Sequence, residues 1–262
     1  MPKTALITGA GSGIGRGFAL ALARRGFHLM LVGRDASRLQ EVAREVGAYT
    51  TASYYCADLS DLPACSRLVD HILENNGVPD LLVNNAALMP AGDFIQCSAA
   101  EIEATFNVNL LAPAELTRRF CASSTPPEGV IFVLSTAARF PQPYNSVYSA
   151  SKAGLRSLAE SLQVEFAGEI RIFRAYPPLT ATDMTDRFVD GHGSIPRADP
   201  VRVAERIVAA YEAGRDEISW LDWEAIPSLF YRLAPRLFRH LLKSQRRYLQ
   251  EMFNSSKKNH EL

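Results

Sequence analysis

Short runs that are apolar along their whole length alternate with longer amphipathic stretches over most of this chain. An apolar run without polar alternation indicates a strand buried on both faces, and the amphipathic stretches between such runs indicate helices. Strands that alternate with helices form parallel sheets, and right-handed crossovers place the helices on both faces. The pattern therefore predicts an α/β fold of the Rossmann type, a doubly wound parallel sheet of about seven strands.

The pattern also gives the order of the elements. The apolar runs predict strands at residues 4–8, 28–32, 51–56, 81–83, 130–134, 170–175 and 217–220. The amphipathic stretches predict helices at residues 13–25, 37–46, 62–75, 99–120, 148–166 and 200–211. Two segments break the rhythm. Residues 179–200 follow the carboxyl end of a strand, which predicts a substrate loop, and residues 221–262 are predicted to form a helical tail.

Composition limits the possible partners. The chain has 28 Lys and Arg residues and 28 Asp and Glu residues, so no overall charge attracts nucleic acid. At 262 residues and 47% apolar composition it can bury one core, and we expect a single domain over residues 1–262. No apolar segment has the length of a secretory signal core or a membrane span, which predicts a cytoplasmic protein. The cysteines lack paired spacing and neighbouring histidines, which predicts free thiols, mostly in the core, and no metal site.

A glycine-rich turn, residues 8–15, follows the first predicted strand and opens the first predicted helix. Glycines there let backbone N–H groups and the positive end of the helix approach a pyrophosphate. The spacing is Gly-x-x-x-Gly-x-Gly, and the predicted dinucleotide contacts are Gly9, Ser12, Gly13, Ile14 and Gly15. An isolated match of this kind can also be a tight turn that needs glycine for its dihedral angles alone.

The end of the second predicted strand indicates which dinucleotide binds. An acidic residue there would bind the ribose 2′-hydroxyl of NAD. Gly33 occupies that position and Arg34 follows it, so a 2′-phosphate would meet a cation and no opposing carboxylate. This favours NADP. NAD is the alternative if Asp35 is the discriminating acid, but Asp35 fits better as the cap of the next helix.

Tyr148 and Lys152 open a predicted helix, and their spacing places a phenol and an ammonium one turn apart on the same face. A phenol with a pKa of about 10 is a poor acid or base at neutral pH, and a fixed cation nearby lowers that pKa. Ser135 follows a buried strand whose carboxyl end faces the same crevice, where its hydroxyl can bind a substrate oxygen. Alone, a Tyr–Lys pair is common on helix surfaces, and such a serine is commonly a turn residue.

Further motifs lie between these, at or near predicted strand ends. They are Asp58 in Ala-Asp-Leu-Ser, Asn84-Asn85-Ala86, and Asn109 in Asn-Val-Asn-Leu-Leu. With the glycine-rich turn and the Ser135, Tyr148 and Lys152 set, their order and spacing make the chain similar to the short-chain dehydrogenase/reductase family over residues 4–220. The resemblance implies an NAD(P)-dependent oxidoreductase that transfers a hydride between a nicotinamide and a carbonyl or secondary alcohol.

The resemblance implies a role for each member of the catalytic set. Tyr148 would be the general acid in reduction and the general base in oxidation, and Ser135 would orient the substrate oxygen. Lys152 would bind the nicotinamide ribose and tune Tyr148. Asn109 would distort its helix and hold a water that passes protons to Lys152, although taken alone it fits cap chemistry.

The resemblance also implies further cofactor contacts. Asp58 would contact the adenine ring, and Asn85 would line the cofactor cleft and support the central sheet. Tyr148 and Lys152 belong to this set as well. The remaining predicted contacts are Leu59, Ala86, Pro177, Thr180 and Thr182.

Two positions depart from the family pattern. Ala87 replaces the glycine that usually follows Asn-Asn-Ala, and it costs stability only if that position needs a positive φ. Pro178 replaces the glycine of a usual Pro-Gly pair, so the wall beside the nicotinamide is expected to be stiffer. Thr182 would cap the next turn or contact the cofactor, and Asp183 would start a helix in the substrate loop.

The tail carries apolar residues at spacings of three and four, with a basic opposite face, and is interrupted at Pro235. This predicts a basic amphipathic helix or helix pair. Three interpretations compete. Packing as a lid or subunit contact is favoured, peripheral binding to an anionic membrane is the second, and a disordered appendage is the third.

The predicted partner is a small carbonyl or alcohol substrate that is partly apolar, because Phe140, Pro141, Pro143 and Tyr144 lie close to Tyr148 in the sequence. A core or turn role for these four residues is an equal alternative. The resemblance further implies a homodimer or homotetramer through the helices at 99–120 and 148–166. The alternative function is a non-catalytic dinucleotide-binding redox sensor, which has no physical need for the full catalytic set.

Overall fold

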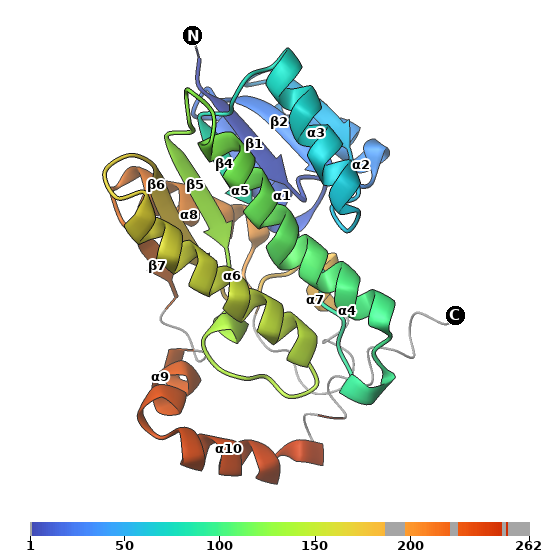
Figure 1. Ribbon diagram of the computed structural model, residues 1–262, viewed down its shortest axis with the longest axis vertical. Coiled ribbons are helices and arrows are strands. Elements are labelled where there is room, and N and C mark those ends of the chain that lie inside the picture. The colour runs from blue at the N-terminus through green and yellow to red at the C-terminus, as the bar shows by residue number, and fades with distance from the viewer. Residues whose placement is uncertain (1, 187–196, 221–224, 248–249, 251–262) are drawn as a thin grey trace.

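A computed structural model of the chain describes residues 2–186, 197–220, 225–247 and 250. Its strands form one parallel sheet in the order β3-β2-β1-β4-β5-β6-β7 (Figure 1). The strands are β1 (Thr4–Thr8), β2 (His28–Gly33), β3 (Ala52–Cys56), β4 (Leu81–Asn84), β5 (Gly129–Val133), β6 (Arg171–Tyr176) and β7 (Glu217–Ser219). This sheet confirms the predicted doubly wound Rossmann-type fold.

The strand order reverses between β1 and β4. The chain runs outward from β1 through β2 to β3, then returns to pair β4 with the other edge of β1, where Ile7 lies opposite Val83. Open α/β sheets bind ligands in the crevice that such a reversal leaves at the carboxyl ends of the strands. The fold therefore places a binding crevice beyond Thr8 and Asn84, the last residues of β1 and β4.

Helices cover both faces of the sheet, as the alternating pattern requires (Figure 1). One face is packed by α1 (Gly13–Ala23), α2 (Ala36–Val46) and α8 (Pro200–Glu212). The other is packed by α3 (Leu62–Asn75), α5 (Ala112–Cys121) and α6 (Ser146–Glu165). Neighbouring strand residues point to opposite faces, so Ile7 joins the first layer and Leu6 the second.

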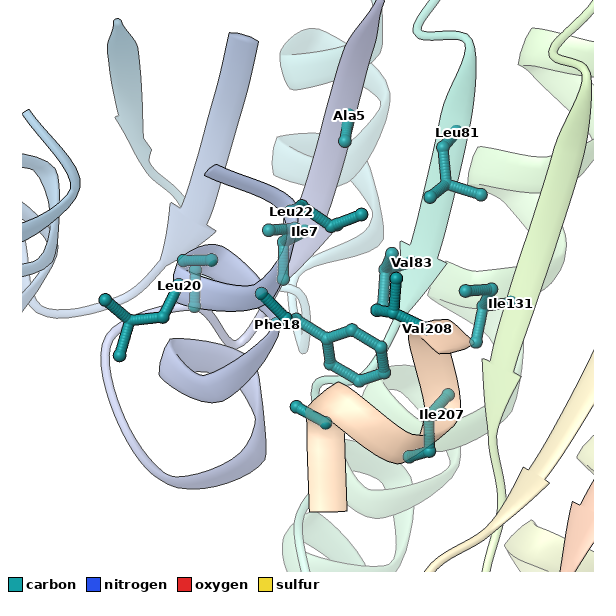
Figure 2. Packing of buried hydrophobic residues seen from close by; sticks show 14 of the residues in the cluster. Ala5, Ile7, Phe18, Leu20, Leu22, Leu81, Val83, Ile131, Ile207 and Val208 are labelled. Carbon is teal, nitrogen blue, oxygen red and sulfur yellow. The ribbon is translucent and has the colours of Figure 1, made fainter. Parts of the chain in front are cut away.

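Phe18 lies fully buried in the first layer. Figure 2 shows its ring directed toward Val83 of the sheet, with Ile207 and Val208 of α8 nearby. Helices α1 and α8 approach closely at Gly17 of α1, where an added Cβ would lie 2.6 Å from the backbone oxygen of Pro200 in α8. This packing holds the start of α1, and therefore the glycine-rich turn, firmly against the sheet.

The predicted helix at 99–120 is interrupted. It consists of α4 (Ala99–Phe106), a π-helical segment (Asn107–Leu111) and α5. The buried Asn109 lies within the segment and directs its side chain to the backbone of Leu88 and to Ser151. The periodicity does not reveal this extra residue per turn, because apolar residues continue through it. Inserts of this kind are frequent at functional sites.

The tail forms the predicted helix pair, α9 (Ala225–Leu233) and α10 (Pro235–Ser244), which lies across the end of the molecule below α6 (Figure 1). Phe238 anchors it: the side chain is buried, and its ring centroid lies 5.6 Å from that of Phe140. Residues 221–224, 248–249 and 251–262 of the predicted tail, and 187–196 of the predicted substrate loop, lie outside the described residues. Within the described part of that loop, α7 (Asp183–Asp186) begins at Asp183 as predicted.

The structure also bears on the predictions about the cysteines and about membrane-spanning segments. All four cysteines are free thiols, but only Cys65 is buried and Cys56 is exposed, so the expectation that most lie in the core is wrong. In the described part of the chain, no helix is both long enough and apolar enough to span a bilayer.

Candidate active site

A cavity of about 640 Å³ opens at the carboxyl ends of β1, β4, β5 and β6, beyond the reversal of strand order. It brings together residues from almost the whole length of the chain. The predicted site residues that line it are Gly9, Ser12, Gly13, Ile14, Gly15, Arg34, Asp58, Leu59, Asn85, Ala86, Ser135, Tyr148, Lys152, Pro177, Thr180 and Thr182. Asn109 is not among the lining residues and lies fully buried behind them.

The glycine-rich turn forms one wall, and two of its glycines are required by sterics. At Gly15 an added Cβ would collide with the backbone oxygen of Gly9. Gly13 has a φ of +51°, and an added Cβ there would lie 2.8 Å from Cγ2 of Thr182. The turn therefore forms a cradle that a side chain would fill, at the N-terminus of α1, where backbone N–H groups favour an anion. These residues fit the pyrophosphate of a dinucleotide.

Asn85 fastens this turn to the sheet. Its Nδ2 donates to the backbone oxygen of Thr8 at 2.8 Å, and its own backbone N–H donates to Thr8 Oγ1 at 2.9 Å. The Ala86 N–H donates to the same hydroxyl at 3.0 Å. The end of β4 thus holds the end of β1, which supports the predicted sheet-supporting position of Asn85.

The far end of the cavity carries two arginines among three carboxylates, those of Asp35, Asp58 and Asp183. Arg34 and Arg38 both line it, from the end of β2 and the first turn of α2. Asp35 is committed to capping α2, because its carboxylate accepts from the N–H groups of Ser37 and Arg38 at 3.0 and 3.1 Å. This agrees with the interpretation of Asp35 as a cap.

Asp58 faces the same end from beyond β3. Burial alone would raise the pKa of its carboxyl, but hydrogen bonds from Ser60 and the charge of Arg34 hold that pKa below its usual value. Asp58 is therefore an anion at neutral pH, and its Oδ1 accepts from the N–H and Oγ of Ser60 at 2.9 and 2.8 Å. Its position fits an adenine contact, as the resemblance implies.

Arg38 also reaches across the cavity to the substrate loop. Its Nη1 lies 2.5 Å from Oδ2 of Asp183, the first residue of α7. Residues 145 positions apart thus meet over the glycine-rich turn. Arg38 was not a predicted site residue, although a second arginine in the first turn of the helix that follows Arg34 was a usable signal.

Tyr148 and Lys152 lie one turn apart in α6, as their spacing predicts. Lys152 Nζ lies 5.9 Å from the ring centroid of Tyr148 and donates to the backbone oxygen of Val133 at 2.9 Å. Only 2% of Lys152 is exposed, and this burial lowers its pKa to about 8. Ser135 lies just beyond the end of β5, and its Oγ accepts from the Ala137 N–H at 3.1 Å.

Asn109 links α6 to the segment around Leu88 on the opposite wall of the cavity. Its Oδ1 accepts from the Leu88 N–H at 2.8 Å, and its Nδ2 donates to the Leu88 oxygen at 2.8 Å and to Ser151 Oγ at 2.9 Å. Ser151 in turn donates to the backbone oxygen of Tyr148 at 2.8 Å. The π-helical segment is therefore coupled to the first turn of α6. Sequence reasoning missed Ser151, although it directly precedes Lys152.

The part of the cavity next to Tyr148 is apolar. Met89, Ala137 and Tyr148 form a small buried cluster with Met184 packed against it. Phe140, Pro141 and Pro143 line the cavity as predicted, but Tyr144 does not, and it lines a smaller pocket instead. Tyr144 has a φ of +63°, which is uncommon for a residue other than glycine. From the tail, Pro227, Phe238, Leu241 and Leu242 complete the apolar lining.

The two departures from the family pattern have structural outcomes. Among the described non-glycine residues only Tyr144 has a positive φ, so Ala87 adopts an ordinary conformation and carries no strain of that kind. Pro178 lines the cavity, and its oxygen accepts from Thr180 Oγ1 at 2.7 Å. The described backbone thus accommodates both substitutions.

Comparison with known proteins accounts for this arrangement. The family model described as short chain dehydrogenase matches residues 3–192. The chain belongs to the short-chain dehydrogenase/reductase family. Membership in this family makes the protein an oxidoreductase with a nicotinamide dinucleotide as cofactor, and the glycine cradle fits the pyrophosphate of that cofactor.

Three similar proteins illustrate the range of this family. The 11-beta-hydroxysteroid dehydrogenase-like 2 protein of Arabidopsis thaliana is 34% identical over 234 residues, which cover 84% of this chain and 75% of that protein. The ketoacyl reductase HetN of Nostoc is 34% identical over 225 residues, covering 82% and 77%. The solved structure of a short-chain dehydrogenase from Sphingobium yanoikuyae in complex with NADPH has a TM-score of 0.76 at 25% identity, covering 90% and 96%.

Proposed function

We propose that this short-chain dehydrogenase/reductase uses NADPH to reduce an apolar ketone or acyl carbonyl, or runs the reverse oxidation of a secondary alcohol with NADP. The observation that carries the proposal is the pairing of Tyr148 with Lys152 on the cavity wall, with the Lys152 ammonium 5.9 Å from the centroid of the phenol ring. A fixed cation favours the phenolate, so proton release from Tyr148 becomes easier.

The residues divide the chemistry among them. A bound nicotinamide supplies or receives the hydride. In reduction, the Tyr148 hydroxyl gives its proton to the substrate oxygen as the carbonyl carbon gains hydrogen, and in oxidation it takes that proton back. Ser135 donates a hydrogen bond to the substrate oxygen and stabilises the charge that develops on it. The Lys152 ammonium stabilises the phenolate form of Tyr148.

The choice of NADPH rests on the two arginines at the far end of the cavity. Arg34 and Arg38 line it, and Asp35 uses its carboxylate to cap α2. Arginine binds phosphate through paired hydrogen bonds, which favours a 2′-phosphate over a 2′-hydroxyl. The NADPH in the similar Sphingobium structure supports the same choice.

The apolar class of substrate rests on the other end. Met89 and Met184 pack with Tyr148, and Phe140, Phe238 and Leu242 also line the cavity; none of these side chains offers a charged group to a sugar or phosphate. The names of the Arabidopsis and Nostoc relatives refer to a hydroxysteroid and to ketoacyl groups, and both are largely apolar. A hydrophobic pocket with a few polar groups at one end suits such carbonyls.

Two proposals concern the surroundings of the enzyme. We infer a homodimer or homotetramer through α4, α5 and α6, which lie side by side and present the exposed Leu111 and Val164 (Figure 1). We also infer a cytoplasmic location and a single catalytic domain over residues 1–262, with the substrate loop at 179–200.

The test is NADPH oxidation, followed by absorbance, against a panel of aliphatic, aromatic, steroid and acyl ketones, with NADH in parallel. We expect turnover with NADPH, lowered about a hundredfold to ten-thousandfold by Tyr148→Phe with NADPH binding retained. Tyr54→Phe is the matched control, because Tyr54 is exposed on β3 and does not line the cavity. NADPH binding without turnover of any carbonyl or alcohol would instead support the redox-sensor alternative.

A further inference from the structure

The outward side of the tail carries a ridge of exposed aliphatic side chains. Ile226, Leu229, Leu233 and Leu237 recur at spacings of three and four and are 72%, 57%, 75% and 57% exposed. Residues at these spacings lie on one side of a helix, so Ile226, Leu229 and Leu233 share one side of α9, and Leu237 follows in the first turn of α10 beyond the break at Ala234. Exposed apolar residues are normal when scattered singly, but several in one short segment mark an interaction surface.

The same segment is strongly cationic. Residues 225–250 contain Arg232, Arg236, Arg239, Lys243, Arg246 and Arg247 and no Asp or Glu, in a chain whose net charge is zero. Arg232, Arg236, Arg239 and Lys243 form no ion pair with any carboxylate of the described residues. Arg246 contacts the Tyr144 hydroxyl at 3.4 Å and is attracted by Asp93 without forming a direct ion pair with it. This concentration of cations makes the tail complementary to an anionic surface.

The inward side of the same helices closes the cavity. Pro227, Phe238, Leu241 and Leu242 line it, and the rings of Phe230 and Tyr231 pack on Phe238 at centroid distances of 5.8 and 5.4 Å. On α10 the ridge residue Leu237 lies one turn before Leu241, which lines the cavity and is 45% exposed, so the ridge reaches the rim of the cavity. A partner that binds the ridge would sit directly against the mouth of the apolar end of the cavity.

We propose that α9 and α10 dock this protein in the plane of an anionic lipid bilayer, so that an apolar substrate dissolved in the bilayer enters the cavity between these helices. A helix with exposed aliphatic residues and a cationic face binds the interface through apolar burial together with attraction to anionic headgroups. A second copy of this chain fits the ridge less well, because pairing two such tails would bring like charges together. The route of substrate entry rests on the proposed function, but the docking does not.

The test is sedimentation of the full-length protein with sucrose-loaded vesicles, either pure phosphatidylcholine or phosphatidylcholine with phosphatidylserine. We expect binding to the anionic vesicles that high salt weakens, and little binding to the neutral ones. The charge variant Arg236→Gln, Arg239→Gln, Lys243→Gln should bind about a hundredfold more weakly, since each cation near the surface contributes about a factor of five. Its matched control, Arg44→Gln, Arg67→Gln, Arg215→Gln, removes three exposed cations outside the tail and should leave binding within twofold.

The ridge is tested separately by Leu229→Ser with Leu233→Ser. We expect at least a tenfold loss of binding to anionic vesicles, while the control pair Phe94→Ser with Ile95→Ser, whose side chains are 59% and 92% exposed and lie outside the tail, has no such effect. Circular dichroism and thermal melting establish that each variant is folded. Equal binding of ridge variant and wild type, or binding that ignores lipid charge, would overturn the proposal.

Two more outcomes are informative. If sedimentation velocity shows a wild-type dimer that the Leu229 and Leu233 substitutions dissociate, and vesicles bind neither form, the ridge is a contact between copies and the proposal is wrong. Because vesicle binding needs no turnover, loss of the proposed reductase activity would leave the docking result standing. If the protein both binds anionic vesicles and reduces ketones, these vesicles should lower the KM for a bilayer-soluble ketone. The ridge variant should lose that effect but keep its kcat.

Discussion

The Lys152 ammonium donates to the backbone oxygen of Val133 at 2.9 Å and is almost completely buried. The bond ties the second turn of α6 to the last residue of β5, immediately before Leu134 and Ser135. Burial of a cation costs free energy, and here it lowers the pKa of Lys152 to about 8. The protein thus holds a poorly solvated cation beside Tyr148, which has consequences for both stability and rate.

The stability consequence is a dependence on pH. An unfolded Lys152 has a pKa of 10.5, so between about pH 8 and 10.5 the unfolded chain binds a proton that the folded one does not. The unfolding free energy attributable to this group therefore rises with pH across that window. We expect Lys152→Met to be more stable than wild type at pH 7, by about 3 kcal/mol at most. The advantage should shrink toward pH 10, which chemical denaturation at several pH values would reveal, and a variant less stable at every pH would contradict this.

The rate consequence concerns the alkaline limb of the pH profile. The pH dependence of kcat/KM reports the pKa values of ionisable groups in the free enzyme. Lys152 loses its charge as the pH rises through about 8. We expect kcat/KM for carbonyl reduction to fall above that pH. Lys152→Arg keeps a cation at all these pH values, so its residual activity should lack that decline up to about pH 10. An unchanged alkaline limb in the Arg variant would assign the limb to another group.

Asn109 makes three buried hydrogen bonds, two to Leu88 and one to Ser151. Asn109→Ala would leave these partners unsatisfied in the interior, so we expect a loss of about 3 kcal/mol in unfolding free energy. Asn107→Ala is the matched control in the same π-helical segment, since Asn107 makes one such bond, to the Ser60 oxygen at 2.8 Å. It should cost about 1 kcal/mol. Equal melting temperatures for the two variants would show that the Asn109 side chain is not what holds the segment.

Arg34 tests the cofactor assignment. If it binds the 2′-phosphate, Arg34→Ala should raise the KM for NADPH by about tenfold or more and leave that for NADH within twofold, because a charge-assisted bond contributes about 1.5–3 kcal/mol. Fluorescence titration of NADPH and NADH in parallel gives the same ratio without turnover. A variant that loses affinity for both dinucleotides equally would place Arg34 elsewhere in the cleft.

Asp183 pairs with Arg38 on the wall of the cofactor cavity. The pair is exposed, with 51% and 66% of the two side chains accessible, so Asp183→Asn should change the unfolding free energy by less than about 0.5 kcal/mol. The same change leaves Arg38 with only its weaker pair to Asp35, at 3.6 Å, and removes an anion from the cavity wall, so we expect NADPH to bind a few times more tightly and NADH to be unaffected. Asp186→Asn, whose carboxylate pairs with Arg197, is the control in the same helix. Tighter binding of both dinucleotides by Asp183→Asn would point to loop opening instead.

Local patterns in the sequence determined the alternation of strands and helices, the glycine cradle at Gly13 and Gly15, and the meeting of Ser135, Tyr148 and Lys152. These depend on the periodicity of neighbouring residues and on the rule that the ends of parallel strands share one edge, so they are readable without coordinates. Only the tertiary structure decided that Phe238 packs on Phe140 at the cavity, that Arg38 forms an ion pair with Asp183, and that Asn109 is hydrogen-bonded to the backbone of Leu88. Such contacts depend on how two distant surfaces fit together, and no local spacing encodes that fit.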